Sequence, residues 1–110
     1  MAMKIALSIL SLLPAALATT CVAESGCAGC GQVASASFVQ DGSDLVADAP
    51  GWGTLTLSGS TIELENVSGS VLTICNYGTV CYYISEHSSC TVGKPDSFNT
   101  GLGIQVWQHP

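Results

Sequence analysis

Hydrophobic and polar residues alternate along much of the chain with the two-residue period of β-strands. In the segment Thr61–Asn66, Ile62 and Leu64 alternate with Glu63 and Glu65, so one face is expected to be buried and the other to face water. Beyond residue 18, no window combines the apolar spacing of an amphipathic helix with capping residues. The pattern therefore predicts an all-β fold.

Short segments rich in Val, Ile, Leu, Thr and Tyr are separated by clusters of Gly, Ser, Asn and Asp, which is typical of antiparallel sandwiches and barrels. Turns at Ser58–Ser60 and Ser68–Gly69 predict hairpins, because Gly adopts a positive φ at low cost. The predicted strands are Ser35–Gln40, Leu45–Ala47, Gly53–Leu57, Thr61–Asn66, Ser70–Asn76, Val80–Ser85, Cys90–Val92 and Ile104–Gln108. We expect a small antiparallel β-sandwich over residues 35–110.

Residues 1–18 have the pattern of a secretory signal peptide. Lys4 supplies a positive charge, Ile5–Leu13 is almost entirely apolar, and the small residues Ala16 and Ala18 suit a signal peptidase. The apolar stretch is shorter than the about 20 residues that a membrane-spanning helix needs. We expect cleavage after Ala18, export to the extracellular space and no membrane anchor.

All six cysteines follow the predicted cleavage point, and an even number in a short exported chain predicts three disulfides. They are Cys21, Cys27, Cys30, Cys75, Cys81 and Cys90. Each bridge typically contributes about 2–4 kcal/mol, a large share of the net stability of a domain this small. Residues 19–34 are rich in Gly and Cys with little periodicity, and they are predicted to form an irregular arm stapled to the sandwich.

Cys27 and Cys30 have the C-x-x-C spacing of a redox motif or of half a zinc site. A thioredoxin-type pair needs a helix N-terminus that lowers a thiol pKa, and a zinc site needs a second pair of closely spaced ligands. The sequence predicts neither, so we expect Cys27 and Cys30 each to bridge to a different partner. We also expect the N-terminal arm to be joined to the Cys75–Cys90 half of the chain, with a local bridge between Cys81 and Cys90. The spacing alone leaves the pairing open, since six cysteines allow fifteen pairings.

The charge of the chain argues against one class of partner. After cleavage, Lys94 is the only Lys or Arg against eight acidic residues, a net charge of −7. Nucleic acids and anionic membranes are bound through clustered Lys and Arg, so neither is expected as a partner. The missing arginine also removes the bidentate phosphate clamp that a secreted ribonuclease would use.

No combination of residues in the sequence predicts catalysis. His87 is expected in an exposed turn, His109 near a frayed C-terminus, and the carboxylates of Glu63 and Glu65 on a solvated strand face. We therefore expect no enzyme, no metal and no other cofactor. His87 and its neighbour Glu86 are candidates for contact with a partner, because they fall in an exposed loop.

The few aromatic residues divide into two groups. Tyr82, Phe98 and Trp107 are expected in the core, because a domain with so few aromatic side chains needs them inside. Trp52 and Tyr83 are candidates for a patch that contacts a protein or a sugar.

Asn66 begins an Asn-Val-Ser sequon in a predicted turn. It is therefore a candidate for an N-linked glycan. The sequence leaves open whether the sequon is used.

Between Leu72 and Trp107, a strand, an aromatic-Gly corner, a cysteine-containing return and a turn into a last strand follow one another. The residues are Leu72-Thr73-Ile74-Cys75, Tyr77-Gly78, Cys81, Ser89-Cys90-Thr91-Val92 and Phe98-Asn99-Thr100-Gly101-Leu102-Gly103-Ile104-Gln105-Val106. This stretch resembles one Greek-key unit of the βγ-crystallin-like secreted proteins, a group that includes microbial killer toxins and a metalloproteinase inhibitor. The resemblance implies a Greek-key β-sandwich.

The resemblance also implies a calcium loop, but the chain departs from the family there. Asn99-Thr100 is followed by Gly103-Ile104, which have no side-chain oxygens. Calcium binds about six to eight oxygen ligands, so this loop lacks some of the ligands that the family's site would supply. We expect no calcium at this loop. Asp41–Asp44 is expected to form an ordinary turn and not a substitute site.

These observations predict a secreted, monomeric and non-enzymatic protein that acts by binding. It would be toxin-like or effector-like, with an extracellular protein or glycan on a host or competitor surface as its partner. One alternative is an inhibitor of a secreted protease that presents Glu86–Ser89 or Gly93–Phe98 as a rigid loop. Another is a small lectin that uses exposed aromatic residues.

Overall fold

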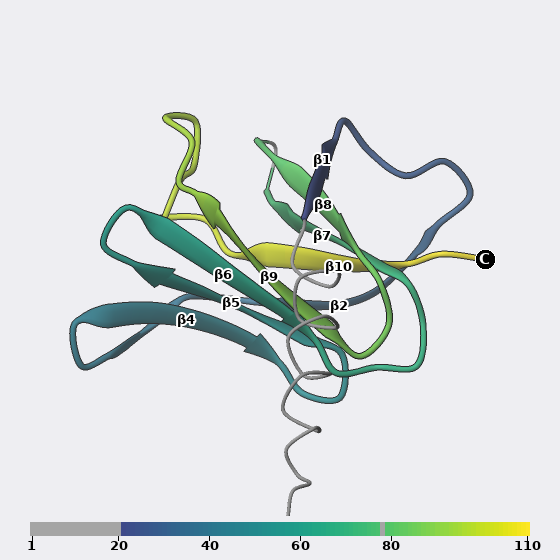
Figure 1. Ribbon diagram of the computed structural model, residues 1–110, viewed down its shortest axis with the longest axis horizontal. Helices are drawn as coiled ribbons and strands as arrows, with labels where there is room; N and C mark the ends of the chain where they lie inside the picture. The colour runs from purple at the N-terminus through teal and green to yellow at the C-terminus, as the bar shows by residue number, and fades with distance from the viewer. Residues whose placement is uncertain (1–20, 78) are drawn as a thin grey trace, which may run out of the picture.

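The computed structural model describes residues 21–77 and 79–110, and every regular element among them is a β-strand (Figure 1). The strands are β1 (Val22–Glu24), β2 (Gly31–Ala36), β3 (Val39–Asp41), β4 (Asp44–Ala49), β5 (Gly53–Ser58), β6 (Thr61–Asn66), β7 (Leu72–Asn76), β8 (Cys81–Ile84), β9 (Ser88–Gly93) and β10 (Ile104–Gln108). The all-β prediction is confirmed. Over the described ranges, no helix is long and apolar enough to cross a membrane. The predicted signal peptide, residues 1–18, lies outside the described residues.

The strands form two five-stranded antiparallel sheets. Sheet A has the order β1-β8-β7-β10-β2, and sheet B has the order β3-β4-β5-β6-β9. Strands β3 to β6 follow one another as hairpins, and Gly42 and Gly59 take positive φ values of 65° and 64° at two of the turns. The chain then passes from one sheet to the other after β6, β8 and β9, so each sheet combines segments that are distant in sequence.

The core lies between the sheets and follows the predicted alternation. In β6, Ile62 and Leu64 are fully buried, whereas Glu63 and Glu65 are exposed on the outer face of sheet B. Sheet A contributes a matching set of fully buried side chains: Leu72, Ile74, Ile104 and Val106. These apolar residues form one cluster, which is the result expected when each sheet buries one face against the other.

Two predictions about the first third of the chain are corrected. The predicted strand Ser35–Gln40 is two strands, because the chain leaves sheet A after Ala36 and enters sheet B at Val39. Between them, Phe38 packs edge-on against Phe98, with 5.7 Å between the ring centroids. The arm is also less irregular than predicted, since its described part contains β1 and the start of β2. Three residues of β1 are too few to show a period in the sequence.

The six cysteines form three disulfides, as predicted. Cys21 pairs with Cys90 and so joins the arm to β9 of sheet B, which agrees with the expected link from the arm to the second half of the chain. The expected bridge between Cys81 and Cys90 is wrong, because Cys90 belongs to the core cluster and pairs there with Cys21, whereas Cys81 does not belong to that cluster. The register of β7 and β8 instead places Cys75 directly opposite Cys81, with 4.0 Å between their Cα atoms.

The expectation that Cys27 and Cys30 bridge to different partners is also wrong, because they pair with each other. The arm turns tightly between them. Gly29 has a φ of 79°, and the backbone N–H of Cys30 donates to the carbonyl of Cys27 at 3.4 Å. This turn brings the two Cα atoms to 5.6 Å, within the usual range for a disulfide.

Candidate binding sites

The outer face of sheet A, which points away from the core, carries polar and aromatic side chains. Along β7 and β10, the residues that alternate with the buried aliphatic ones are Thr73, Cys75, Gln105 and Trp107. The register of the two strands places Thr73 beside Trp107 and Cys75 beside Gln105. Part of this face lies under the arm, which returns across it after β1.

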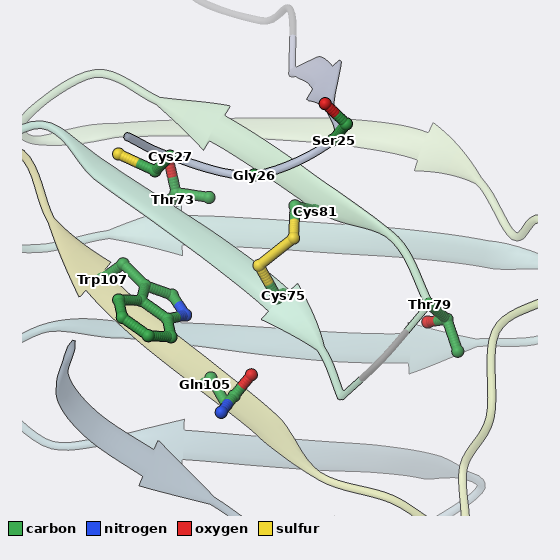
Figure 2. Close-up of a pocket in the computed structure, with 9 residues that line it drawn as sticks. All are labelled: Ser25, Gly26, Cys27, Thr73, Cys75, Thr79, Cys81, Gln105 and Trp107. Atoms are coloured by element: carbon green, nitrogen blue, oxygen red, sulfur yellow. A yellow bond between two sulfur atoms is a disulfide. The ribbon is translucent and has the colours of Figure 1, made fainter. Parts of the chain in front are cut away.

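A groove of about 380 Å³ lies between the arm and this face (Figure 2). Its floor contains Thr73, Gln105, Trp107 and the Cys75–Cys81 disulfide, and the arm lines it at residues 25–27. Figure 2 shows the indole of Trp107 and the amide of Gln105 along β10, beside the strand that carries Cys75. Because a disulfide and three neighbouring strands, β8, β7 and β10, form the floor, the groove is built on a rigid part of the molecule.

The residues that line the groove are uncharged. They offer one indole, one carboxamide and several hydroxyl groups, together with disulfide sulfur. Small-ligand sites in proteins combine apolar or aromatic surface with a few polar groups that fix orientation. The groove therefore suits an uncharged ligand that has both an apolar face and hydrogen-bonding groups.

His109 lies against the arm and is held in place, whereas the sequence suggested a frayed terminus. Its backbone N–H donates to the carbonyl of Val71 at 3.1 Å, and its Nε2 lies 2.8 Å from Oγ1 of Thr73. The hydroxyl of Thr73 in turn donates to the carboxylate of Glu24 in β1. The edge of the His109 ring meets the ring of Tyr83, with 5.3 Å between centroids.

Tyr83 is therefore part of the packing that holds the arm. It lies opposite Val22 in the pairing of β1 with β8, and it is half-buried. Of the four predicted contact residues, it is the one that the structure places in sheet A.

The other three predicted contact residues lie near one another at one end of sheet B. The loop after β6 connects them: the N–H of Val67 donates to the carbonyl of Trp52 at 2.9 Å, and the N–H of His87 donates to the carbonyl of Ser68 at 3.1 Å. Glu86 and His87 are exposed at the tip of the β8–β9 turn, and Trp52 is half-buried. A hollow of about 240 Å³ beside His87 is lined in part by Val67.

His87 has an unusual backbone conformation. Its φ of 49° lies in the left-handed region, which residues other than Gly rarely adopt. Such a conformation persists only where the surrounding structure fixes it. The structure thus presents the His87 side chain on a fixed turn at the surface.

The sequon residue Asn66 is buried, with 1% of its surface exposed. Its Nδ2 lies within hydrogen-bond distance of the carbonyls of Ser70, Ile84 and Ser85, at 2.8, 3.2 and 3.0 Å. Its Oδ1 accepts from the backbone N–H and the hydroxyl of Ser68, at 2.8 and 2.7 Å. The nitrogen that would carry a glycan is therefore inside the fold, where it ties loops together. The sequon correctly indicated a turn, but it did not indicate that the buried side chain of Asn66 holds this turn together.

The loop that the resemblance would assign to calcium is organised around an amide. The carbonyls of Asn99, Leu102 and Gly103 lie 3.0, 3.3 and 3.0 Å from Nδ2 of Asn76. A cation at this point would have to displace the Asn76 side chain, whose Oδ1 also accepts from the N–H of Asn99 at 2.7 Å.

Sequence reasoning missed the groove because it placed Trp107 in the core. Tyr82 and Phe98 are buried, as predicted, but Trp107 is only partly buried and lies on the outer face of sheet A. The sequence of Ile104–Gln108 already indicated this, because the apolar residues Ile104 and Val106 alternate with Gln105 and Trp107. A strict two-residue alternation would have placed Gln105 and Trp107 together on the outer face of the sheet.

We compared the chain with protein-family models, with curated protein sequences and with solved structures, and none matched. Two surfaces of the molecule are candidates for binding a partner. One is the groove under the arm on sheet A, and the other is the cluster of loops around Val67 at the end of sheet B.

Proposed function

We propose that this chain is a secreted, monomeric and non-enzymatic binding protein that recognises a surface molecule of a host or competitor cell through the groove on sheet A. The predicted signal peptide, cleaved after Ala18, and three disulfides in a small domain both favour an extracellular location. The observation that carries the proposal is the groove itself, where Trp107 lies among uncharged polar groups on a disulfide-braced floor.

The chemistry of the groove favours a neutral sugar unit of a surface glycan. A sugar ring has a face of C–H groups that can pack on the indole of Trp107, while its hydroxyl groups can exchange hydrogen bonds with the amide of Gln105 and the hydroxyl of Thr79. The excess of acidic residues in the chain works against phosphate and other anionic ligands. Because strand pairing fixes the floor beforehand, little conformational entropy is lost on binding.

Binding of the mature protein to an array of immobilised neutral glycans tests this proposal. We expect binding that falls at least about tenfold in Trp107→Ala, since loss of the stacking surface removes on the order of 1.4 kcal/mol or more. Trp52→Ala is the matched control, because it removes a tryptophan that does not line the groove and should leave affinity unchanged. Glycan binding that is equal in parent and Trp107→Ala, or turnover of RNA, glycan or peptide, would overturn the proposal.

The second candidate is inhibition of a secreted protease by the loop Glu86–Ser89. The observation that favours it is the fixed, left-handed conformation of exposed His87, with Cys90 of the Cys21–Cys90 disulfide close behind it in β9. A loop held in this way loses little entropy when it enters an active-site cleft. Stoichiometric loss of protease activity on mixing, abolished by His87→Ala and kept by Trp107→Ala, would favour inhibition over the groove.

We also propose that the fold is of the βγ-crystallin-like Greek-key type. The support is the arrangement of β7, β8 and β10, which lie side by side in sheet A although β9 of sheet B lies between β8 and β10 in sequence. A return of this kind by a long connection is characteristic of Greek keys. An experimental structure with a different set of strand connections would contradict the proposal.

A further inference from the structure

The arm and the C-terminus bring three potential metal ligands together. The sulfur atoms of Cys27 and Cys30 and a ring nitrogen of His109 all lie within 4.8 Å of one another. His109 is 82 positions from Cys27, and its Nε2 is 3.4 Å from the Cys27 sulfur. All three residues are half-buried, and Cys27 also lines the groove.

The imidazole of His109 is held by sheet A and not by the arm disulfide. Its ring lies 2.8 Å from the Thr73 hydroxyl and meets the ring of Tyr83, and its backbone is tied to Val71. Opening of the Cys27–Cys30 bond would therefore leave the imidazole in place. The Thr73 hydroxyl contacts Nε2, the same ring nitrogen that lies 3.4 Å from the Cys27 sulfur, so a metal bound at Nε2 would replace this hydrogen bond.

We propose that the reduced form of this site, the Cys27 and Cys30 thiolates with His109, binds one zinc-class divalent cation. The proposal goes beyond glycan binding, which requires no metal. Two thiolates and an imidazole are the ligands that zinc prefers, and C-x-x-C spacing allows both sulfurs to reach one ion.

The chemistry needs an external dithiol reductant. A thiolate of the reductant attacks one sulfur of the disulfide and forms a mixed disulfide, and the other sulfur leaves as a thiolate. The second thiol of the reductant then releases the first sulfur and closes the reductant's own disulfide, so that two electrons and two protons have passed to Cys27 and Cys30. Zinc binding subsequently displaces the two thiol protons.

The arm disulfide is the one best placed to open first. Thiol exchange requires access to a sulfur atom, and Cys21, Cys75 and Cys90 are 9%, 6% and 3% exposed, so each of the other two disulfides has at least one buried partner. Cys27 and Cys30 are both half-exposed and lie on a turn outside the sheets. We therefore expect limited treatment with dithiothreitol to free two thiols, with alkylation and peptide mapping placing both in the arm.

Metal titration of the mature chain in this two-thiol form tests the proposal. We expect one Zn²⁺ per chain by competition with a chromophoric chelator, and with Co²⁺ the sulfur-to-metal absorption of a site containing thiolates. His109→Ala should weaken zinc binding at least about tenfold, because it removes a ligand, and loss of even an outer partner of a metal ligand costs about 10–100-fold. His87→Ala is the matched control and should leave binding unchanged.

The variant Cys27→Ser/Cys30→Ser keeps the other two disulfides and should bind no zinc after the same treatment. Uptake of zinc by this variant equal to that of the parent would overturn the proposal. It would also be overturned if another disulfide opened first, if the two-thiol form bound no metal, or if His109→Ala bound zinc as tightly as the parent. Glycan binding is measured separately on the oxidised protein, so failure of one proposal leaves the other distinguishable.

Discussion

Asn66 and Asn76 play matching parts at the ends of β6 and β7, two strands that belong to different sheets. Each is 1% exposed, and each places its Nδ2 within hydrogen-bond distance of three backbone carbonyls outside its own strand. Each Oδ1 also accepts from a backbone N–H, that of Ser68 for Asn66 and that of Asn99 for Asn76. The two amides thus satisfy buried main-chain groups where strand pairing ends.

Asn66→Ala should lower the free energy of unfolding by about 3 kcal/mol, because it leaves buried carbonyls without a donor. Asn99→Ala is the control, since its Oδ1 accepts a single exposed bond from the N–H of Gly101 and its loss should cost less than about 1 kcal/mol. Urea denaturation followed by tryptophan fluorescence measures both. Equal losses in the two variants would contradict the role assigned to Asn66.

The burial of Asn66 also predicts that the folded protein carries no glycan at this sequon. Attachment to Nδ2 would remove a donor to the carbonyls of Ser70 and Ile84 and would place a sugar inside the fold. The intact mass of protein secreted from a eukaryotic host, before and after enzymatic removal of N-glycans, checks this. A native, fully disulfide-bonded fraction with sugar on Asn66 would show that the loop does not require the free amide.

Removal of the three disulfides should have graded effects on stability. The paired cysteines are separated by 69, 6 and 3 positions for Cys21–Cys90, Cys75–Cys81 and Cys27–Cys30. In the chain-entropy view, closing the longest of these loops is worth about 4 kcal/mol and the two short ones about 2 kcal/mol each. Urea denaturation of the three paired Cys→Ser variants measures the order, and a largest loss at Cys27–Cys30 would contradict the expected ranking.

Tyr82 should make the free energy of unfolding depend on pH in the alkaline range. Burial raises the pKa of its phenol above the ordinary value of 10.0, because the charged form is poorly solvated in the fold. Above pH 10, the unfolded chain therefore loses this proton while the folded chain keeps it. The contribution of Tyr82 is complete below pH 10 and is lost as the pH rises towards the pKa of the folded state.

Tyr82→Phe should make the fall in unfolding free energy above pH 10 shallower than in the parent. Denaturation curves at a series of pH values between 8 and about 11 measure this slope. If parent and Tyr82→Phe showed the same dependence on pH, the phenol would not be the group responsible.

The sequence was most informative where a single strand decides its own faces. The alternation of Ile62 and Leu64 with Glu63 and Glu65 predicted β6, its buried face and its wet face, and all were confirmed. Most other strands were placed within a few residues for the same reason. Secretion, Greek-key type and function stay predictions, because they concern cleavage, connections and partners and not the period of a strand.

The sites could not be predicted because they are formed by residues that meet only in the folded chain. The contact of Cys27 with His109 spans almost the whole described chain, and the pairing of Cys75 with Cys81 depends on the register of β7 and β8. The spacing of residues along the sequence predicts neither the Cys27–His109 contact nor the Cys75–Cys81 pairing. Trp107 was misplaced for a different reason: the small number of aromatic residues suggested that it lies in the core, whereas its position in the strand suggested the outer face.

A disulfide map of the secreted protein tests the account most directly, because the arm, the groove and the reduced-site proposal all depend on the pairing. Proteolysis without reduction, followed by mass spectrometry, identifies the linked peptides. We expect three linked pairs, in which Cys21 is bonded to Cys90, Cys27 to Cys30 and Cys75 to Cys81. A homogeneous map with any other of the fifteen pairings would contradict it.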